Sequence, residues 1–465
     1  MKNLKEKYIA SKEFYIYVLG MIIPMVTQNL ITNFVSMIDN IMVGKVGTLP
    51  MSGVSIVNQF IFVFNITIFG AMSGASIFGT QFFGKKDTKG QRYTVRYRLI
   101  MAVLVILAGM LILKTFGPEL IGLFLSKKDS PEKIASTLAY GMEYLNIIIW
   151  SLIPFAIGQA YSSVVRECGK MKICMYASMG AIVINLFLDY TLIFGKCGFP
   201  EMGVAGAAIA TVIAKSVEAL IVISWVHRHP AENPYIIGIF HHFFHIPASL
   251  IRRIVIKSFP LLLNEFLWAL GMAMVSQCYS VKGIDVVAAR NIAVTITNLF
   301  SAVYVQMGSV IGIIIGARLG AGHFEEARDC ANKLIVFAVF VSTLTAIALV
   351  PVGIVFPMAY KTEAAIRSLA TFYIIVQAIT MPMESYANAA YFTLRSGGKI
   401  GITFLFDSGF TWVILIPFAY ALTHFVNMDI HWILCLVTFT ILLKCFVGHF
   451  MVKSDIWVNN IVNEE

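Results

Sequence analysis

Twelve apolar segments, each more than twenty residues long, follow one another along this chain. A helix needs about 20 mostly apolar residues to cross the hydrocarbon core of a membrane. A bilayer can bury all twelve segments, so we predict an all-α polytopic membrane protein with twelve transmembrane helices. The segments are 14–37, 52–77, 94–116, 136–160, 173–195, 203–226, 254–278, 285–312, 333–357, 365–391, 400–424 and 430–450.

The charged residues are too few to cover a soluble protein of this length. They make up 13% of the 465 residues, whereas soluble proteins contain roughly 25%. The net charge of +10 could suggest a nucleic-acid partner, but the basic residues cluster in alternate loops. With a cytoplasmic N-terminus, 23 lysines and arginines fall in inner segments and 10 in outer ones, while Lys215 and Lys444 fall within spans. This bias follows the positive-inside rule and predicts that both termini are cytoplasmic.

The first apolar segment is expected to be a membrane helix rather than a cleaved signal peptide. It is too long for the apolar core of a signal sequence, and no small-residue cleavage site follows it. Together with the short loops, this favours a multi-pass protein of a bacterial cytoplasmic membrane.

Residues of the same or similar kind recur at constant separations in the two halves. The pairs 236 residues apart are Pro24 and Pro260, Gly47 and Gly283, Gly84 and Gly320, and Arg92 and Arg328; those 229 apart are Gln159 and Asn388, Arg166 and Arg395, and Gly169 and Gly398. We therefore predict a parallel internal repeat, with an N-lobe at 1–226, a linker at 227–253 and a C-lobe at 254–465. Transporters with internal repeats bind substrate and ions near the membrane midplane and rock one bundle on the other.

The linker is rich in histidine, proline and aromatic residues. A metal site is one interpretation, but we favour a partly amphipathic linker lying at the membrane surface. The histidines are His227, His229, His241, His242 and His245.

Polar residues within the predicted spans of the first half suggest a cation site. Asn185 and Asp189 are four residues apart and share one helix face. Asp39 ends the first span, and Thr211 on the sixth adds a hydroxyl oxygen. Oxygen ligands suit a hard cation such as Na⁺, and a carboxylate can equally carry a proton. The alternatives are a solvated Asp39 at a helix end and an Asp189 that caps one.

Further acids fall within the spans of the second half. They are Glu265, Glu384 and Asp407, on the seventh, tenth and eleventh predicted helices. An acid inside a span is costly and usually faces a cavity or a partner. We expect most of these acids to lack a basic partner and to line a cavity; the alternative for a single acid is a structural role. Lys215 and Glu218, three residues apart, are expected to pair with each other.

Prolines interrupt the spans at matched places in the two halves: Pro24, Pro154, Pro260 and Pro382. Proline removes a backbone hydrogen bond and permits a kink. We interpret these four as hinge or kink positions, with harmless packing kinks as the alternative.

Motifs for other functions are missing. The nearest approach to a nucleotide-binding loop, Gly79 to Lys85, is followed by Lys86 where Ser or Thr is required. No HExxH, GxSxG or TVGYG motif occurs. We therefore predict that the protein is not an enzyme and that its energy comes from an ion gradient or from a partner.

Five segments resemble the multidrug and toxic compound extrusion (MATE) family: MIDNIMVGKVGT, QFFGKKD, INLFLDYTLIFG, GVAGAAIATVIA and LGAGHFEEAR. The resemblance covers nearly the whole chain, in the expected order. It implies a V-shaped molecule of two six-helix lobes that exports organic cations in exchange for Na⁺ or H⁺.

The resemblance also assigns site residues. Asp39, Asn185, Asp189 and Thr211 would form the N-lobe cation site and hold Na⁺ if that is the coupling ion. Glu265 matches the helix-seven acid of NorM-like members, and Glu384 lies where that branch carries an acid on helix ten. The helix-five aspartate is instead typical of DinF-like members. This mixture leaves open both the coupling ion and the lobe that binds drug.

The resulting hypothesis is a cation-coupled antiporter that exports small hydrophobic organic cations by alternating access. It would need no cofactor beyond Na⁺ or H⁺ and would work as a monomer within membrane lipid, with no nucleic-acid partner. One alternative is a narrow-specificity exporter or flippase of an amphiphilic metabolite or lipid-linked sugar. A channel or a membrane-embedded enzyme is the other.

Overall fold

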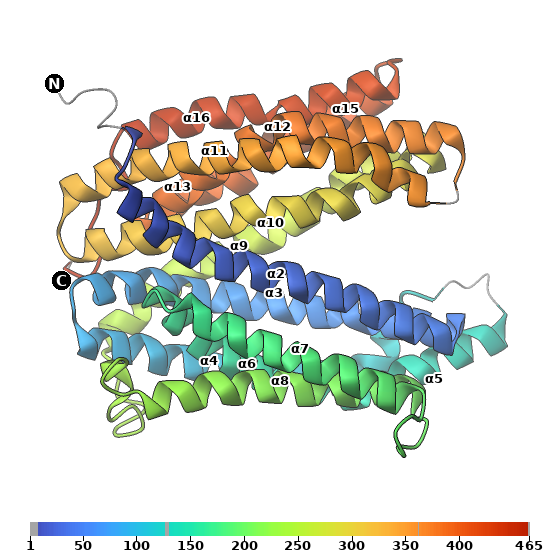
Figure 1. Cartoon of the computed structure of the whole chain (residues 1–465), viewed down its shortest axis with the longest axis horizontal. Helices are drawn as coiled ribbons and strands as arrows, with labels where there is room; N and C mark the ends of the chain where they lie inside the picture. Colours follow the sequence, from blue (N-terminus) through green and yellow to red (C-terminus); the bar gives the residue numbers. More distant parts are fainter. Residues whose placement is uncertain (1–7, 126–129, 361, 464–465) are drawn as a thin grey trace. The chain divides into compact units, whose positions relative to one another are not determined.

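The computed structural model describes residues 8–125, 130–360 and 362–463. Within these ranges it contains twelve helices long and apolar enough to cross a membrane, and no β-strand (Figure 1). The predicted all-α polytopic fold with twelve spans is therefore confirmed. Six lysines counted in the charge argument lie outside the described residues: Lys2, Lys5, Lys7, Lys127, Lys128 and Lys361.

The first six spans are formed by seven α-helices and one 3₁₀ turn. They are α2 (Lys12–Val46), α3 (Thr48–Gly84), α4 (Thr88–Gly122), α5 (Pro131–Ile148), η1 (Ile149–Ser151), α6 (Leu152–Glu167), α7 (Met171–Ile193) and α8 (Gly203–Arg228). The turn η1 joins α5 and α6 into a single span. A second short turn, η2 (Pro234–Ile236), lies in the predicted linker.

The last six spans include a stretch of irregular helix. The elements are α9 (Ala248–Ser280), α10 (Ile284–Gly320), α11 (Phe324–Val355), η3 (Phe356–Ala359), α12 (Ala364–Ser396), α13 (Ile400–Phe404), η4 (Leu405–Gly409), η5 (Thr411–Leu415), α14 (Ile416–His424), α15 (Ile430–Phe439) and α16 (Ile441–Lys453). The segments η4 and η5 are π-helical, which makes the eleventh span wider than an α-helix in its middle.

Most helices extend beyond the apolar segments that predicted them. Helix α2 has 35 residues and α3 has 37, which at about 1.5 Å per residue exceeds the roughly 30 Å hydrocarbon core. An apolar segment ends at the first cluster of polar residues, whereas the backbone hydrogen bonds of the helix continue past it. The extra turns carry polar residues that suit the membrane interface.

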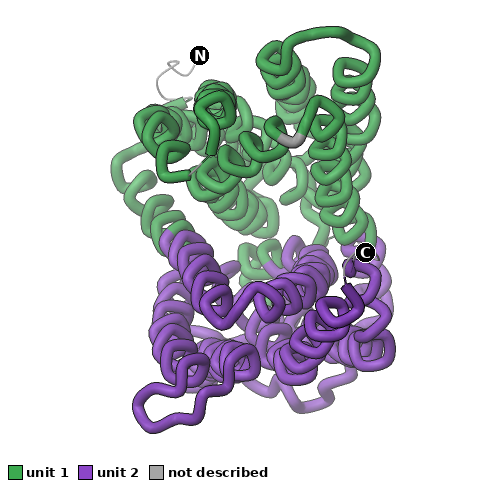
Figure 2. Tube along the Cα trace, turned by 90° about the vertical axis from the view of Figure 1, so that its right-hand side faces the viewer, with its two compact units in different colours: residues 1–26, 80–87, 259–465 green, residues 27–79, 88–258 purple. Residues whose placement is uncertain are grey.

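The chain divides into two compact units (Figure 2). Unit 1 comprises Met1–Val26, Thr80–Asp87 and Phe259–Glu465, and unit 2 comprises Thr27–Gly79 and Thr88–Ser258. Three boundaries fall inside α2, α3 and α9, and the fourth falls directly before α4, in the loop that follows α3. The lobes expected from the sequence remain a prediction.

Helix α8 is central to unit 2, where it packs against α5, α6 and α7. The sequence of its first turns explains this position, because Val204 to Ala208 are small and buried and let neighbouring helices approach closely. The core of the unit also contains Val57, Ile148 and Tyr161.

Helix α12 has the corresponding place in unit 1, where it packs against α10, α11 and α16. Ala370, Ala378 and Ala390 are buried along its length. Its neighbours therefore lie close enough to place charged groups from several helices beside one another.

Within unit 1, the last turns of α3 and α10 cross at glycine. A Cβ atom on Gly84 would collide with the backbone of Ala317, and one on Gly320 would collide with the backbone of Gln81. Gln81 and Ala317 are 236 residues apart, as are Gly84 and Gly320. Two repeats related by a two-fold axis would produce this reciprocal contact, which supports the predicted repeat.

Candidate cation-binding sites

Asp39 on α2 and Asp189 on α7 form an acidic pair inside unit 2. Their carboxyl groups lie within hydrogen-bonding reach of each other, although only a protonated carboxyl could donate in such a contact. Both oxygens of Asp189 and Oδ1 of Asp39 are buried, and no residue that the structure describes donates a hydrogen bond to them. Asp189 is 1% exposed. Two close carboxylates repel each other, so the pair is suited to receive a cation or a shared proton.

Asn185 extends this site by one turn of α7. Its amide nitrogen Nδ2 is buried and makes no hydrogen bond. Because a buried unpaired polar group is costly, such groups commonly mark a functional position. Neither alternative for the two acids fits these contacts: Asp39 is not fully solvated, and Asp189 caps no helix end.

Thr211 is the predicted ligand with the weakest support. Its hydroxyl donates to the carbonyl oxygen of Ala207, one turn earlier on α8, at 3.0 Å. No contact recorded for the described residues joins it to Asp39 or Asp189. Its role as a ligand stays a prediction.

Two neighbours of the acidic pair were missed by sequence reasoning. Tyr144 on α5 is buried and lies close enough to Asp39 and Asp189 to feel both charges. Its hydroxyl donates to Asn58 Oδ1 on α3 at 3.2 Å. A tyrosine and an asparagine within apolar helices give a weak signal, because both are common packing residues.

Lys215 on α8 is the base whose charge acts on Asp39, and it is already paired. Its ammonium is 3.1 Å from Glu218 Oε2 on the same helix, which confirms the predicted pair. Glu218 also accepts a hydrogen bond from the Ser178 hydroxyl. The charge of Lys215 is thus largely matched by Glu218, and the acidic pair stays under-neutralised.

The acids of unit 1 are arranged differently. Asp407, in η4, has its Oδ1 2.7 Å from the ammonium of Lys444 on α16. Its Oδ2 accepts a hydrogen bond from Asn264 Nδ2 on α9 at 3.0 Å. Glu265, also on α9, lies 3.7 Å from a guanidinium nitrogen of Arg395 on α12.

These two ion pairs correct the expectation that most of the acids lack a basic partner. The partners lie on other helices, and Lys444 follows Asp407 by 37 positions. Local spacing could not reveal either pair, because helix packing alone brings these residues together. The third acid, Glu384 on α12, has no direct ion pair or hydrogen bond recorded among the described residues, but it lies within electrostatic reach of Lys444 and Asp407.

A buried ion pair in unit 2 was also missed. Arg98 on α4 and Glu167 at the end of α6 are 0% and 2% exposed and are joined at 2.8 Å. Arg98 also donates to Ser163 Oγ at 3.1 Å and to the carbonyl oxygen of Ala75 at 3.0 Å. With so many satisfied contacts, this pair is a structural element rather than a site that awaits a ligand.

The predicted hinge prolines lie in two different settings. Pro24, Pro260 and Pro382 are inside continuous α-helices, whereas Pro154 follows the 3₁₀ turn η1 by three residues. The unit boundaries fall two residues after Pro24 and two residues before Pro260.

Arg96 on α4 holds the linker against this helix. This side chain is 5% exposed and donates four hydrogen bonds to linker carbonyl oxygens, those of Gly238, Ile239, His241 and His245. No cluster of three or more potential metal ligands occurs in the described part of the chain. The histidine linker is therefore anchored through its backbone.

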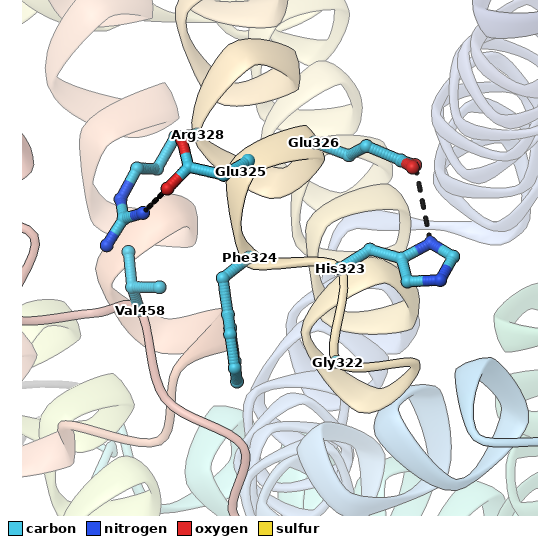
Figure 3. Close-up of a pocket in the computed structure, with 7 residues that line it drawn as sticks. All are labelled: Gly322, His323, Phe324, Glu325, Glu326, Arg328 and Val458. Atoms are coloured by element: carbon cyan, nitrogen blue, oxygen red, sulfur yellow. Dashed lines mark hydrogen bonds and ion pairs between the residues drawn. The ribbon is translucent and has the colours of Figure 1, made fainter.

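A pocket of about 460 Å³ lies beside the start of α11 (Figure 3), and none of its lining residues is a predicted site residue. Its charged residues are already paired with one another: Arg328 with Glu325 at 2.5 Å, and His323 with Glu326 at 3.4 Å. We therefore do not assign it to substrate.

Comparison with known proteins bears on this arrangement of helices and acids. The MatE family model matches residues 24–191 and 260–421, more than half of the chain. The chain is 27% identical over 308 residues to "Probable multidrug resistance protein NorM" of Thermotoga maritima, a match that covers 65% of this chain and 63% of that protein. It is 23% identical to "Multidrug resistance protein MdtK" of Edwardsiella ictaluri, over 87% of this chain and 86% of that protein.

The fold also matches a solved structure. "Crystal structure of MATE in the straight conformation" aligns over 98% of both chains with a TM-score of 0.83 and 16% sequence identity. Members of the matched family are transporters and not enzymes. The chain therefore belongs to the MatE family of multidrug and toxic compound extrusion transporters.

Proposed function

We propose that this protein exports small hydrophobic organic cations from the cell in exchange for Na⁺ or H⁺. The observation that carries the proposal is the acidic pair Asp39–Asp189, whose buried oxygens lack donors. A charge within a membrane span is costly. Two neighbouring acids without a cationic partner are best explained by a cation or proton that comes and goes.

In this mechanism, the coupling ion and the substrate favour different states of the transporter. Na⁺ or H⁺ binds Asp39 and Asp189 from the outside and is released inside, and substrate moves the other way. An ion shifts a conformational equilibrium only by its differential affinity for the two states. Asn185, Tyr144 and Thr211 would adjust the geometry around the bound ion.

Pro24 and Pro260 are proposed as the bending points of this cycle, because each lies within two residues of a unit boundary. Pro154, beside the break η1, and Pro382 on α12 are proposed as further kinks. We also propose that both termini face the cytoplasm and that the monomer is sufficient for transport.

The test is efflux of ethidium, a fluorescent cation, from cells that lack their own pumps. Wild type and Asp39→Asn would each be given an imposed Na⁺ gradient or an imposed pH gradient. Export that follows one gradient and is lost in the variant supports the proposal and names the ion. Undiminished export by Asp39→Asn, at equal amounts in the membrane, would reject the role of the acidic pair.

Arg395 and Lys444 in unit 1 favour the second candidate, a narrow-specificity exporter of an amphiphile with an anionic group. A panel of cationic and anionic substrates separates the two. Export of several unrelated cations supports the first, and export of a single anionic amphiphile supports the second.

A further inference from the structure

Lys444 lies in the last membrane-spanning helix, where a charged group is held mostly away from water. Its ammonium is 2.7 Å from Asp407 Oδ1, and the two side chains are 15% and 17% exposed. This burial is incomplete, because part of each side chain is exposed.

Two phenyl rings complete the surroundings of this ammonium. Lys444 Nζ lies 5.3 Å from the ring centroid of Phe406 and 5.7 Å from that of Phe410. Proteins bind organic ammonium groups with aromatic faces, at distances within about 6 Å. A carboxylate and two rings are thus arranged as a receptor for a monovalent organic cation. We call Phe406, Asp407 and Phe410 the cation cage.

Groups other than Lys444 hold the carboxylate of the cage in place. Asn264 Nδ2 donates to Asp407 Oδ2 at 3.0 Å, and the Ser408 hydroxyl donates to Asn264 Oδ1 at 2.7 Å. The cage falls within the π-helical segments and the residue between them. Such segments are uncommon and frequently occur at functional sites.

The ring of Phe406 is fixed by close packing. It is 3% exposed, and a Cβ atom on Gly448 would lie 3.1 Å from its ring. Lys444, by contrast, reaches the cage at the end of a flexible four-carbon stem. The walls of the cage are therefore rigid and its present occupant is movable.

A second acid is available to a displaced Lys444. Glu384 on α12 feels the charges of both Lys444 and Asp407 and has no direct partner of its own recorded among the described residues. The ammonium could leave Asp407 without losing all electrostatic compensation.

We propose that the cation cage binds the organic cation that the protein exports, and that Lys444 is a tethered occupant which the substrate displaces toward Glu384. The ligand class is protonated amines and quaternary or flat aromatic cations of single charge. This inference rests on the proposed export of organic cations and adds the site, its aromatic walls and its built-in competitor.

Binding of ethidium to the purified full-length protein in detergent, followed by fluorescence, tests the proposal. A tethered competitor weakens the apparent affinity for any free cation, because the open site is populated only part of the time. We expect Lys444→Met to tighten binding by about tenfold or more, equivalent to about 1.4 kcal/mol. Adding Asp407→Asn to that variant should remove the gain.

Two variants serve as controls for the change of charge. Lys444→Arg retains the positive charge and should not reproduce the gain. Lys333→Met removes a lysine that is paired with Asp329 at 2.6 Å on α11 and should leave the affinity for ethidium unchanged. Lys444→Met that binds ethidium as weakly as wild type, or more weakly, overturns the proposal.

Efflux measured in parallel separates this result from the proposed function. Wild-type protein that exports ethidium while Lys444→Met shows unchanged binding rejects the cage and leaves the export function standing. Tighter binding to Lys444→Met in the absence of wild-type export supports the cage and rejects ethidium export.

A second variant keeps the test decisive if Lys444→Met does not fold. Phe410 is only half-buried, so Phe410→Leu should fold and remove one aromatic wall while Lys444 stays in place. Lys444 loses the same cation–π contact, but ethidium also loses the stacking of its flat ring system on Phe410. We therefore expect ethidium binding to weaken by about fivefold, the size of one aromatic stacking contact. Unchanged binding in this variant also overturns the proposal.

Discussion

The acids of the two units have opposite electrostatic surroundings. In unit 2, Asp39 and Asp189 lie beside each other, and their buried oxygens accept no hydrogen bond within the described part of the chain. In unit 1, Asp407 is 2.7 Å from Lys444 and Glu265 is 3.7 Å from Arg395. The sequence alone presents all four as acids within, or at the end of, a predicted span.

We propose that this difference reflects separate roles of the two units. A pair of acids that repel each other is stabilised by any small cation or proton that reaches it, so unit 2 is suited to the coupling ion. An acid that is already paired with an ammonium is stabilised without a ligand. Only a cation that competes with the lysine can take the place of that ammonium. Unit 1 is therefore suited to a bulkier organic cation.

The largest expected effect is loss of coupled export when the acidic pair of unit 2 is neutralised. We expect Asp189→Asn to reduce gradient-driven ethidium efflux to background, because the remaining carboxyl no longer attracts the ion as a pair. Efflux from cells with equal membrane levels of each variant measures this. Glu325→Gln, which changes an exposed acid paired with Arg328 in unit 1, is the control and should retain export. Equal losses in the two variants would break the comparison.

The second-largest expected effect is on thermal stability, which should fall in Asp407→Asn but not in Asp189→Asn. Asp407→Asn leaves Lys444 in a poorly solvated site without its carboxylate, which costs roughly 3–5 kcal/mol for a buried pair. Asp189→Asn instead relieves repulsion and should leave thermal stability unchanged or raised. Thermal unfolding of the purified variants at a pH near 7 compares them. A lower melting temperature for Asp189→Asn than for Asp407→Asn would contradict the division between the units.

A smaller effect is expected at the boundary between the units. Pro260→Ala restores a backbone hydrogen bond to α9 and should stiffen it. We expect slower export with unchanged ethidium binding, because the acids and the cation cage are untouched. Initial efflux rates and equilibrium binding, measured on the same variant, test this. Pro351→Ala on α11, away from any unit boundary, is the control and should export at the wild-type rate.

The smallest perturbation tests orientation alone. Cys197 is exposed in the loop between α7 and α8, a loop predicted to face outward. A membrane-impermeant maleimide added to intact cells should label it. Cys168 should not react, because it is predicted to face inward and because burial raises the pKa of its thiol to about 12. Labelling only after the cells are opened would reverse the predicted topology.

Much of the fold follows from the sequence. The twelve spans, the pairing of Lys215 with Glu218 and the family motifs depend on residues close together in the chain, and each is found as expected. The predicted site residues Asp39, Asn185 and Asp189 also carry local signals, because polar groups are rare within spans. Tyr144, Asn58 and the buried pair Arg98–Glu167 carry no comparable signal, since their meaning depends on the neighbours that packing supplies.

The sequence by itself determined that this chain crosses a membrane twelve times and belongs with multidrug transporters. Hydrophobic length and short motifs are local properties, and the bilayer leaves helices as the way to satisfy the backbone. Only the tertiary structure decided which acids are neutralised. Lys444 and Asp407 are separated by 37 positions and Asn264 and Asp407 by 143. Charges so far apart in the chain meet only when packed helices bring them together.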